Sequence, residues 1–413
     1  MRWPLNSISK PAARPFPPRL GTRQLGSIAS GLHSGERIAV RVGSSGSVNI
    51  DLHNLAKVSS PEPLLIYLPP FSTAAPSNNL ALLPRFTQKY ALAVIHYRWT
   101  EDSSTGKSVV EGASDDDETF HQRFVPRWPA PIHDTLKAYS WIVENLAPKT
   151  YTRRDIYVYG SYLGASLATS LALTEAHPHE RMAVRGCVAY NGVYNWTMFL
   201  PDHSVNKLPQ PLSNNFLAEF ISTPRDPNFH ELKQMADRLF HKPDDMFDPF
   251  ASSCLFFQTP GLLIPPSFNE TAIHPLSSLA DLSWLPEGTL DMLFMPPKHP
   301  RRSPLVFPPR KSTLKVPEML LLHDPAPSLP PSFLRRRQRR TKHNYGNNFR
   351  TQAEALASLA RRSINKIELK ERMKWDEDMD ENSDEAERRI QVVDAGIHGD
   401  GSITAWLEDR MSG

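Results

Sequence analysis

The stretch that decides the fold is the pentapeptide Gly160-Ser161-Tyr162-Leu163-Gly164. The run 155–159 before it has the apolar character of a buried strand, and the run of small residues 165–173 after it favours a helix. Glycines on both sides of the central residue allow a strand and a helix to meet at a tight turn. The pattern therefore predicts a sharp strand-to-helix turn with Tyr162 at its tip.

Further strand and helix patterns alternate along the chain. A hairpin is predicted over 36–56, with a Gly-Ser turn at 43–46. Apolar runs predict strands at 64–68, 91–97, 184–190, 319–323 and 390–393, and helical patterns predict helices at 80–89, 133–145, 231–240, 352–375 and 403–411. The runs 64–68 and 156–159 are wholly apolar, as expected for interior strands that are buried on both faces. The sequence therefore predicts an α/β protein with a mostly parallel central sheet flanked by helices.

The 413 residues divide by composition into four segments. Residues 1–35 are expected to be a disordered basic segment, and 36–196 and 313–413 are expected to form the two parts of the α/β core. The irregular, proline-rich stretch 197–312 is too long for a simple connection and predicts a large insertion between the two parts of the core. Within the last segment, 335–387 is a charged insertion that is basic at 335–342 and acidic at 376–387, which we interpret as solvated faces.

The N-terminal segment allows two interpretations. It is rich in arginine and serine and has no acidic residue before Glu36, as is typical of mitochondrial transit peptides. Its five prolines would break the amphipathic helix of such a peptide, which favours a plain disordered tail. The protein is accordingly predicted to be mitochondrial, with the cytoplasm as the alternative.

Charge and cysteine content limit the kinds of partner. The net charge is only +3, so nucleic acid is an unlikely partner by this criterion, although an RNA contact of the basic run stays open. Two cysteines, Cys187 and Cys254, cannot form a disulfide framework, and Cys187 lies in an apolar run typical of a buried, inert thiol. No apolar run reaches the roughly 18–20 residues that span a bilayer. The sequence has no phosphate-binding loop, dinucleotide fingerprint or metal-ligand spacing, so neither a cofactor nor a metal is predicted.

The order of several short motifs resembles the esterase/lipase branch of the α/β-hydrolase fold family, the branch related to hormone-sensitive lipase. Besides the pentapeptide, these motifs are His96-Tyr97-Arg98-Trp99 at the end of a predicted strand, Trp128-Pro129-Ala130-Pro131 followed by Asp134 and Trp141, and the segment 392–399. The resemblance covers 60–196 and 314–413. It implies an α/β-hydrolase fold, a large cap in the insertion 197–312, and an esterase-like arrangement of nucleophile, oxyanion hole, acid and histidine.

Three of those four positions depart from the family pattern. Tyr162 stands in the nucleophile slot, and Ser161 is the only serine of the pentapeptide, one position early. The loop after the predicted strand 64–68 begins with two prolines, which have no N–H to donate to an oxyanion. Pro327 aligns with the acid, and Asp324 is nearby at another offset. Only His398 stands where the family presents its catalytic histidine.

Three hypotheses about function follow. The first is a catalytically degenerate esterase, a pseudoenzyme that keeps a pocket for a small acyl or hydrophobic ligand or for a protein partner. The second is a divergent carboxylic-ester hydrolase that uses Ser161 and His398, with Asp324 as the acid. The third is a mitochondrial scaffold or an RNA-associated subunit that uses the basic insertion.

Overall fold

The computed structural model describes most of the predicted core. The described residues are 35–58, 61–70, 83–98, 128–149, 151–200, 203, 236, 239–240, 242–262, 300–325, 348–375, 384–396 and 399–411. Several sequence predictions therefore lie outside the described residues: the N-terminal segment, most of the predicted helix 231–240, the basic run 335–342, the greater part of the acidic run, Pro327 and His398.

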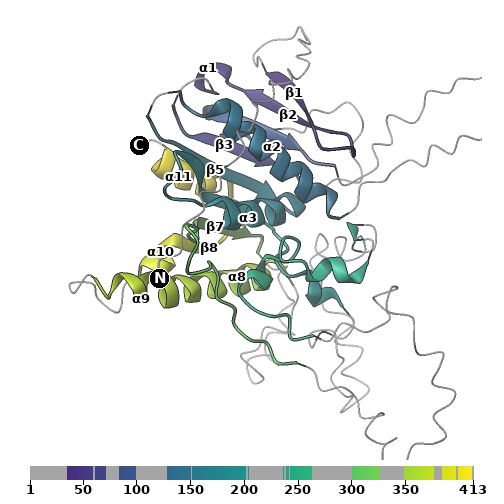
Figure 1. Ribbon diagram of the computed structural model, residues 1–413, viewed down its shortest axis with the longest axis vertical. Helices are drawn as coiled ribbons and strands as arrows, with labels where there is room; N and C mark the ends of the chain where they lie inside the picture. Colours follow the sequence, from purple (N-terminus) through teal and green to yellow (C-terminus); the bar gives the residue numbers. More distant parts are fainter. Residues whose placement is uncertain are drawn as a thin grey trace, which may run out of the picture.

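Within the described residues, an eight-stranded sheet forms the centre of the structure (Figure 1). Its strands are β1 (Glu36–Arg41), β2 (Ser47–His53), β3 (Leu64–Leu68), β4 (Ala91–His96), β5 (Arg154–Ser161), β6 (Met182–Tyr190), β7 (Glu318–His323) and β8 (Ile390–Asp394). Across the sheet their order is β1-β2-β4-β3-β5-β6-β7-β8. Only β2 runs antiparallel to its neighbours, and all other pairs are parallel. This arrangement, with helices on both faces, confirms the predicted α/β-hydrolase fold.

The interior position of β3 and β5 follows from their residues. All five residues of β3 are buried, and β3 lies between β4 and β5. The runs 64–68 and 156–159 carry no charged side chain on either face, so they require cover on both sides, which only the middle of a sheet provides. The predicted hairpin is also confirmed, since β1 and β2 pair antiparallel in the register Glu36 to Leu52.

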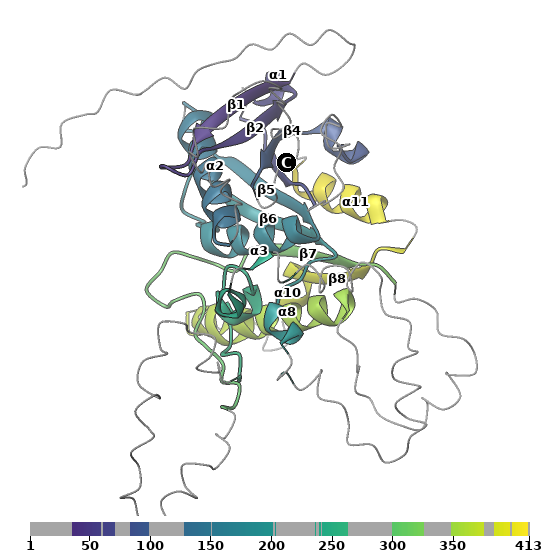
Figure 2. The same cartoon turned by 90° about the vertical axis from the view of Figure 1, so that its right-hand side faces the viewer.

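Helices cover both faces of the sheet. The longer ones are α2 (Ala130–Leu146), α3 (Leu163–Glu175), α8 (Phe349–Ser363) and α11 (Gly399–Met411), and the shorter ones include α1 (Leu55–Val58), α9 (Lys370–Arg372) and α10 (Glu385–Arg389). One core cluster joins α2, α3 and α8 to the sheet, and the other joins α11 to the opposite face (Figure 2). Alternate residues of β3 divide between the two clusters, with Ile66 in the first and Tyr67 in the second. Among the described residues, no helix is long and apolar enough to cross a membrane.

The predicted helix over 80–89 is wrong. The described part of this stretch is a 3₁₀ turn, η1 (Arg85–Lys89), which begins directly after Pro84. A proline inside a helix removes a hydrogen bond and clashes with the preceding turn, so the helix cannot run through position 84. Phe86 and Thr87 are the buried residues of this turn, and Phe86 belongs to the core cluster that joins α11 to the sheet.

The described part of the proline-rich stretch packs onto the core rather than away from it. It contains three 3₁₀ turns, η2 (Trp196–Phe199), η3 (Pro243–Phe247) and η4 (Ser253–Phe256). Ser170 Oγ on α3 donates to the Phe250 carbonyl at 2.7 Å, and Phe240 and Phe257 belong to the same core cluster as α3 and α8. Within the described residues, this stretch therefore extends the α3–α8 side of the molecule.

Both cysteines are buried free thiols. Cys187 on β6 is completely inaccessible, and Cys254 is nearly so. Burial raises the pKa of each thiol to about 12, because the thiolate would lose its hydration. The predicted burial of Cys187 is therefore confirmed.

A buried histidine in this region predicts a pH dependence of stability. His203 is 2% exposed, and its Nε2 lies 2.8 Å from Nη2 of Arg302, so the ring accepts this hydrogen bond in its neutral form. Burial, assisted by the Arg302 charge, lowers the pKa of His203 from 6.5 to about 4. Between pH 6.5 and about pH 4, His203 therefore binds a proton in the unfolded chain but stays neutral in the folded chain.

We expect the free energy of unfolding to fall as the pH drops from 6.5 toward 4, by about 1–2 kcal/mol through this group at about pH 5. The variant His203→Gln, whose amide oxygen accepts the same Arg302 hydrogen bond, should lose less stability over this interval. Urea unfolding of both proteins across the pH range measures the difference. Identical losses in the two proteins would exclude His203 as the titrating group.

Candidate functional site

The predicted strand-to-helix turn is present, and its tip is strained. Tyr162 has φ 52° and ψ −115°, and it links Ser161, the last residue of β5, to α3. A non-glycine residue at positive φ is held there by its surroundings. A Cβ on Gly160 would lie 2.2 Å from the Gly164 carbonyl oxygen, and a Cβ on Gly164 would lie 2.2 Å from that of Leu68. The two glycines are therefore required by close backbone approach.

The tyrosine ring occupies the space above this turn. It packs edge to face against Tyr190 at the end of β6, with ring centroids 6.3 Å apart, and against Phe349 at the start of α8, at 5.7 Å. Its hydroxyl lies 3.5 Å from Nδ2 of Asn191. An amide nitrogen donates to the phenol and cannot remove its proton. These contacts hold the Tyr162 ring in place, and the Asn191 amide reaches its hydroxyl as a donor.

Ser161 faces away from the tip. It is 6% exposed, and its hydroxyl hydrogen-bonds the phenols of Tyr67 and Tyr159 in the core cluster beneath α11. Burial raises the pKa of Tyr67 to about 12, against the opposing effect of the Ser161 hydrogen bond. Ser161 thus has two unionised phenols as partners, and neither can act as its base at neutral pH.

Asp324 follows β7 directly and is held by two side chains from the end of β6. The Tyr190 hydroxyl donates to Oδ1, and Asn191 Nδ2 donates to Oδ2 at 2.7 Å. Asn191 in turn accepts from the Asp324 amide at 2.9 Å. Burial and the neighbouring carboxylate raise the pKa of Tyr190, which keeps its proton on the phenol. Both carboxylate oxygens are therefore engaged within the cluster.

Tyr190 and Asn191 were missed by the sequence analysis. Asn191 is completely buried and has φ 50°, which is unusual for a residue other than glycine. The available signal was its position, because polar residues that follow parallel strands gather at one edge of the sheet.

The loop after β3 presents carbonyl oxygens to the turn. Besides Leu68, Pro69 has its carbonyl oxygen 2.6 Å from where a Gly164 Cβ would lie. The Tyr97 hydroxyl donates to the same Pro69 oxygen at 2.6 Å. Pro69 and Pro70 have no N–H, so neither can serve as an oxyanion donor. Residues 71 and 72, the next possible donors, lie outside the described part of the chain.

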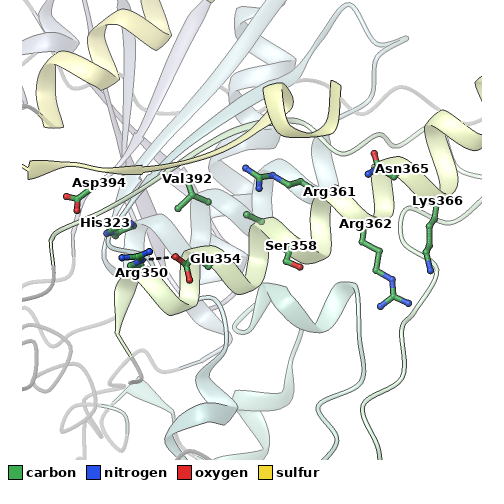
Figure 3. Close-up of a pocket in the computed structure, with 11 residues that line it drawn as sticks. His323, Arg350, Glu354, Ser358, Arg361, Arg362, Asn365, Lys366, Val392 and Asp394 are labelled. Carbon is green, nitrogen blue, oxygen red and sulfur yellow. Dashed lines mark hydrogen bonds and ion pairs between the residues drawn. The ribbon is translucent and has the colours of Figure 1, made fainter. Parts of the chain in front are cut away.

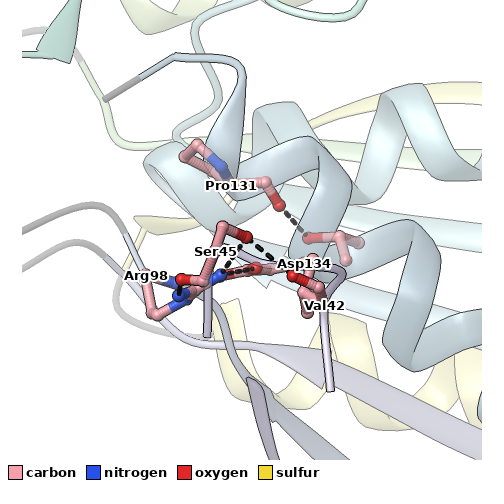
Figure 4. Close-up of polar contacts among 6 residues, drawn as sticks. Val42, Ser45, Arg98, Pro131 and Asp134 are labelled. Atoms are coloured by element: carbon pink, nitrogen blue, oxygen red, sulfur yellow. Dashed lines mark hydrogen bonds and ion pairs between the residues drawn. The ribbon is translucent and has the colours of Figure 1, made fainter. Parts of the chain in front are cut away.

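Arg98 and Asp134, two of the motif residues, form a buried ion pair (Figure 4). Arg98 donates from Nη2 to Oδ1 at 2.6 Å and from Nε to Oδ2 at 2.9 Å, and its backbone N–H also donates to Oδ2 at 2.9 Å. Its remaining nitrogen donates to the Ser45 carbonyl in the β1–β2 turn. The pair therefore connects the hairpin, the end of β4 and the first turns of α2, and it stabilises their relative positions.

A groove of about 800 Å³ lies between α8 and the edge strand β8 (Figure 3). Its lining includes His323, Arg350, Arg361, Arg362 and Asp394. Arg350 pairs with Glu354 at 2.7 Å, and Arg361 donates from Nε and Nη2 to the Ile390 carbonyl. The groove is polar and contains an excess of cations, so its chemistry suits an anionic or strongly polar ligand and not an apolar acyl chain.

Comparison with known proteins gives matches of structure only. No protein-family profile matches the sequence, and no curated protein sequence matches it. Among solved structures, an esterase from the fungus Rhizomucor miehei is 12% identical with a TM-score of 0.45, covering 92% of this chain and 83% of that one. Carboxyl esterase 2 from the fungus Tuber melanosporum is 13% identical with a TM-score of 0.41, covering 83% and 76%.

A thermostable carboxylesterase cloned from a metagenomic library is 13% identical with a TM-score of 0.36 over 55% of this chain. The match spans 66% of that carboxylesterase, and 62% of an esterase from Pyrobaculum calidifontis. These similar structures are esterases of the α/β-hydrolase fold. The strand order and the strained turn at Tyr162 place this chain in the same fold class.

Proposed function

We propose that this chain is a catalytically degenerate member of the α/β-hydrolase fold class that acts by binding and not by ester hydrolysis. The observation that carries the proposal is the position of Tyr162. It has the strained backbone of the turn residue, and its ring is packed between Tyr190 and Phe349. The nucleophile slot is thus filled by a side chain that serves the core.

The surroundings of the turn support the same proposal. A serine-type mechanism needs a small nucleophile, a base, an acid that orients the base, and N–H donors for the oxyanion. Ser161 lies on the other side of the turn, and Asp324 is occupied by Tyr190 and Asn191. Loss of triad members and of an oxyanion donor leaves little catalysis, because each donor contributes roughly 100–1000-fold.

We expect the purified protein to show no turnover of short-chain acyl esters and no labelling by a fluorophosphonate serine probe. Ser161→Ala and Tyr162→Phe should behave like the unchanged protein in both assays. Labelling that is lost in Ser161→Ala but retained in Tyr162→Phe would overturn the proposal and favour the divergent hydrolase with Ser161 and His398.

A second variant asks whether only the nucleophile has been lost. Tyr162→Ser restores a serine at the tip of the turn, whereas the Asp324 contacts to Tyr190 and Asn191 stay unchanged. Because Asn191 reaches position 162 as a hydrogen-bond donor and Asp324 is held by Tyr190 and Asn191, we expect this variant to stay unlabelled. Strong labelling of Tyr162→Ser would show that the remaining machinery is intact. The pseudoenzyme would then differ from an esterase by a single residue.

A further inference from the structure

A row of cations runs along an exposed side of the helix that continues from α8 through η8 (Ile364–Leu369) into α9. Its first two members, Arg362 and Lys366, also line the groove between α8 and β8. Arg362, Lys366, Lys370 and Lys374 follow one another at intervals of four residues, and all four side chains are exposed. Within the described part of the chain, none of the four forms an ion pair or a side-chain hydrogen bond. We call these four residues the basic row.

The π-helical turn η8 keeps the basic row on one side of the helix. In an α-helix, with about 3.6 residues per turn, a repeat of four residues drifts around the axis by about 40° per step. A π-helical turn, closed by i→i+5 hydrogen bonds, is wider, so four residues fall short of a full turn. The two deviations have opposite signs and offset each other. Figure 3 shows Arg362 and Lys366 on the same side, opposite to Arg361.

The other side of this helix packs into the hydrophobic core. Leu356, Ala360 and Ile364 are completely buried and belong to the core cluster that joins α2, α3 and α8 to the sheet. The helix therefore offers no apolar face that could insert into a membrane surface. One large aromatic side chain is exposed at the end of the row, Trp375, at 90%. Exposed tryptophan beside unpaired cations is a combination that single-stranded nucleic acids recognise well.

We propose that the basic row and Trp375 bind single-stranded nucleic acid, with the cations on successive phosphates and the indole stacked on a base. Successive cations lie about 6 Å apart along an α-helical axis, so the row can follow an extended phosphate backbone. Arginine and lysine on phosphates, with one stacking ring, provide no base-edge readout, so binding is independent of sequence. The acidic run that follows Trp375 in the sequence repels the same ligand, and binding is therefore of moderate affinity and sensitive to salt.

The test uses the full chain and a fluorescein-labelled oligouridine of about 16 nucleotides, with binding followed by fluorescence anisotropy. Four phosphate contacts on a single strand give a slope of about −3 for the logarithm of the affinity against that of the salt concentration. Changing all four cations of the row to glutamine should weaken binding about tenfold or more at about 50 mM salt and flatten this slope. Trp375→Ala should weaken binding about fivefold or more with the slope unchanged, because stacking releases no counterions.

A matched control removes the same charge elsewhere. Arg301, Arg310, Lys311 and Lys315 are also exposed, on the segment that precedes β7. Changing these four to glutamine should leave the affinity within about twofold of the unchanged protein. Equal losses in both quadruple variants, or no loss in the row variant, would overturn the proposal. So would failure to bind the oligouridine at low salt while anionic phosphatidylserine vesicles are bound through the row.

Discussion

Replacing Gly164 by alanine is expected to lower the free energy of unfolding by at least about 3 kcal/mol. The new Cβ would lie 2.2 Å from the Leu68 carbonyl oxygen and 2.6 Å from that of Pro69. Both are backbone atoms, so no side-chain rotation relieves the contact, and β3 or α3 has to shift. Since β3 lies in the middle of the sheet, such a shift disturbs packing on both faces. Denaturant unfolding followed by circular dichroism measures the loss.

Gly401 provides the matched control for this substitution. It lies within α11, and a Cβ added there meets no atom within 4 Å. Gly401→Ala should raise the free energy of unfolding by about 0.5–1 kcal/mol, because alanine loses less backbone entropy in a helix. A Gly164→Ala protein as stable as the unchanged chain would contradict the close approach of β3 to the turn.

Asp134→Ala should destabilise the protein by about 3 kcal/mol or more. The Asp134 side chain is completely inaccessible, whereas that of Arg98 is 24% exposed. Removal of the carboxylate leaves a largely buried guanidinium, and one backbone N–H, without their shared acceptor. The contact with Ser45 alone cannot compensate for the lost charge. The partial exposure of Arg98 places the expected loss at the lower end of the range for buried pairs.

The control for this variant is an exposed ion pair of similar length. Arg350 and Glu354 are 2.7 Å apart on α8, with side-chain exposures of 55% and 42%. Glu354→Ala should cost no more than about 0.5 kcal/mol, because water screens an exposed i,i+4 pair. Chemical unfolding of the two variants side by side tests the comparison. If the two losses were equal, burial would not be what makes the Arg98–Asp134 pair important.

The turn at Tyr162 shows that the fold and the chemistry of this scaffold can be separated. The strained backbone is present with a tyrosine at its tip, and the ring of this tyrosine packs against Tyr190 and Phe349. Its glycines are required for packing, because β3, β5 and α3 approach within contact of one another at Gly160 and Gly164. The turn is therefore kept by the architecture of the sheet, whatever side chain it carries.

The sequence by itself determined the strands and the turn. The apolar runs 64–68 and 156–159 predicted interior strands, and the pentapeptide 160–164 between a strand and a helix pattern predicted the tight turn. The helix predicted over 80–89 was wrong, because Pro84 interrupts this stretch and only a 3₁₀ turn follows it. Apolar runs, glycines and prolines act on residues next to them in the chain, so their effects can be predicted from the sequence without knowledge of the fold.

Only the tertiary structure decided what the residues at the end of the sheet do. Tyr162 packs against Phe349, and Asp324 binds Tyr190 and Asn191, all across long separations in sequence. These contacts depend on strand order, on register and on the direction of each side chain, none of which is encoded by spacing along the chain. The face of the helix that carries the basic row likewise depends on the π-helical turn η8. Sequence spacing identified Tyr162 and Asp324, but it missed Tyr190 and Asn191, and only three-dimensional packing assigned these residues their partners.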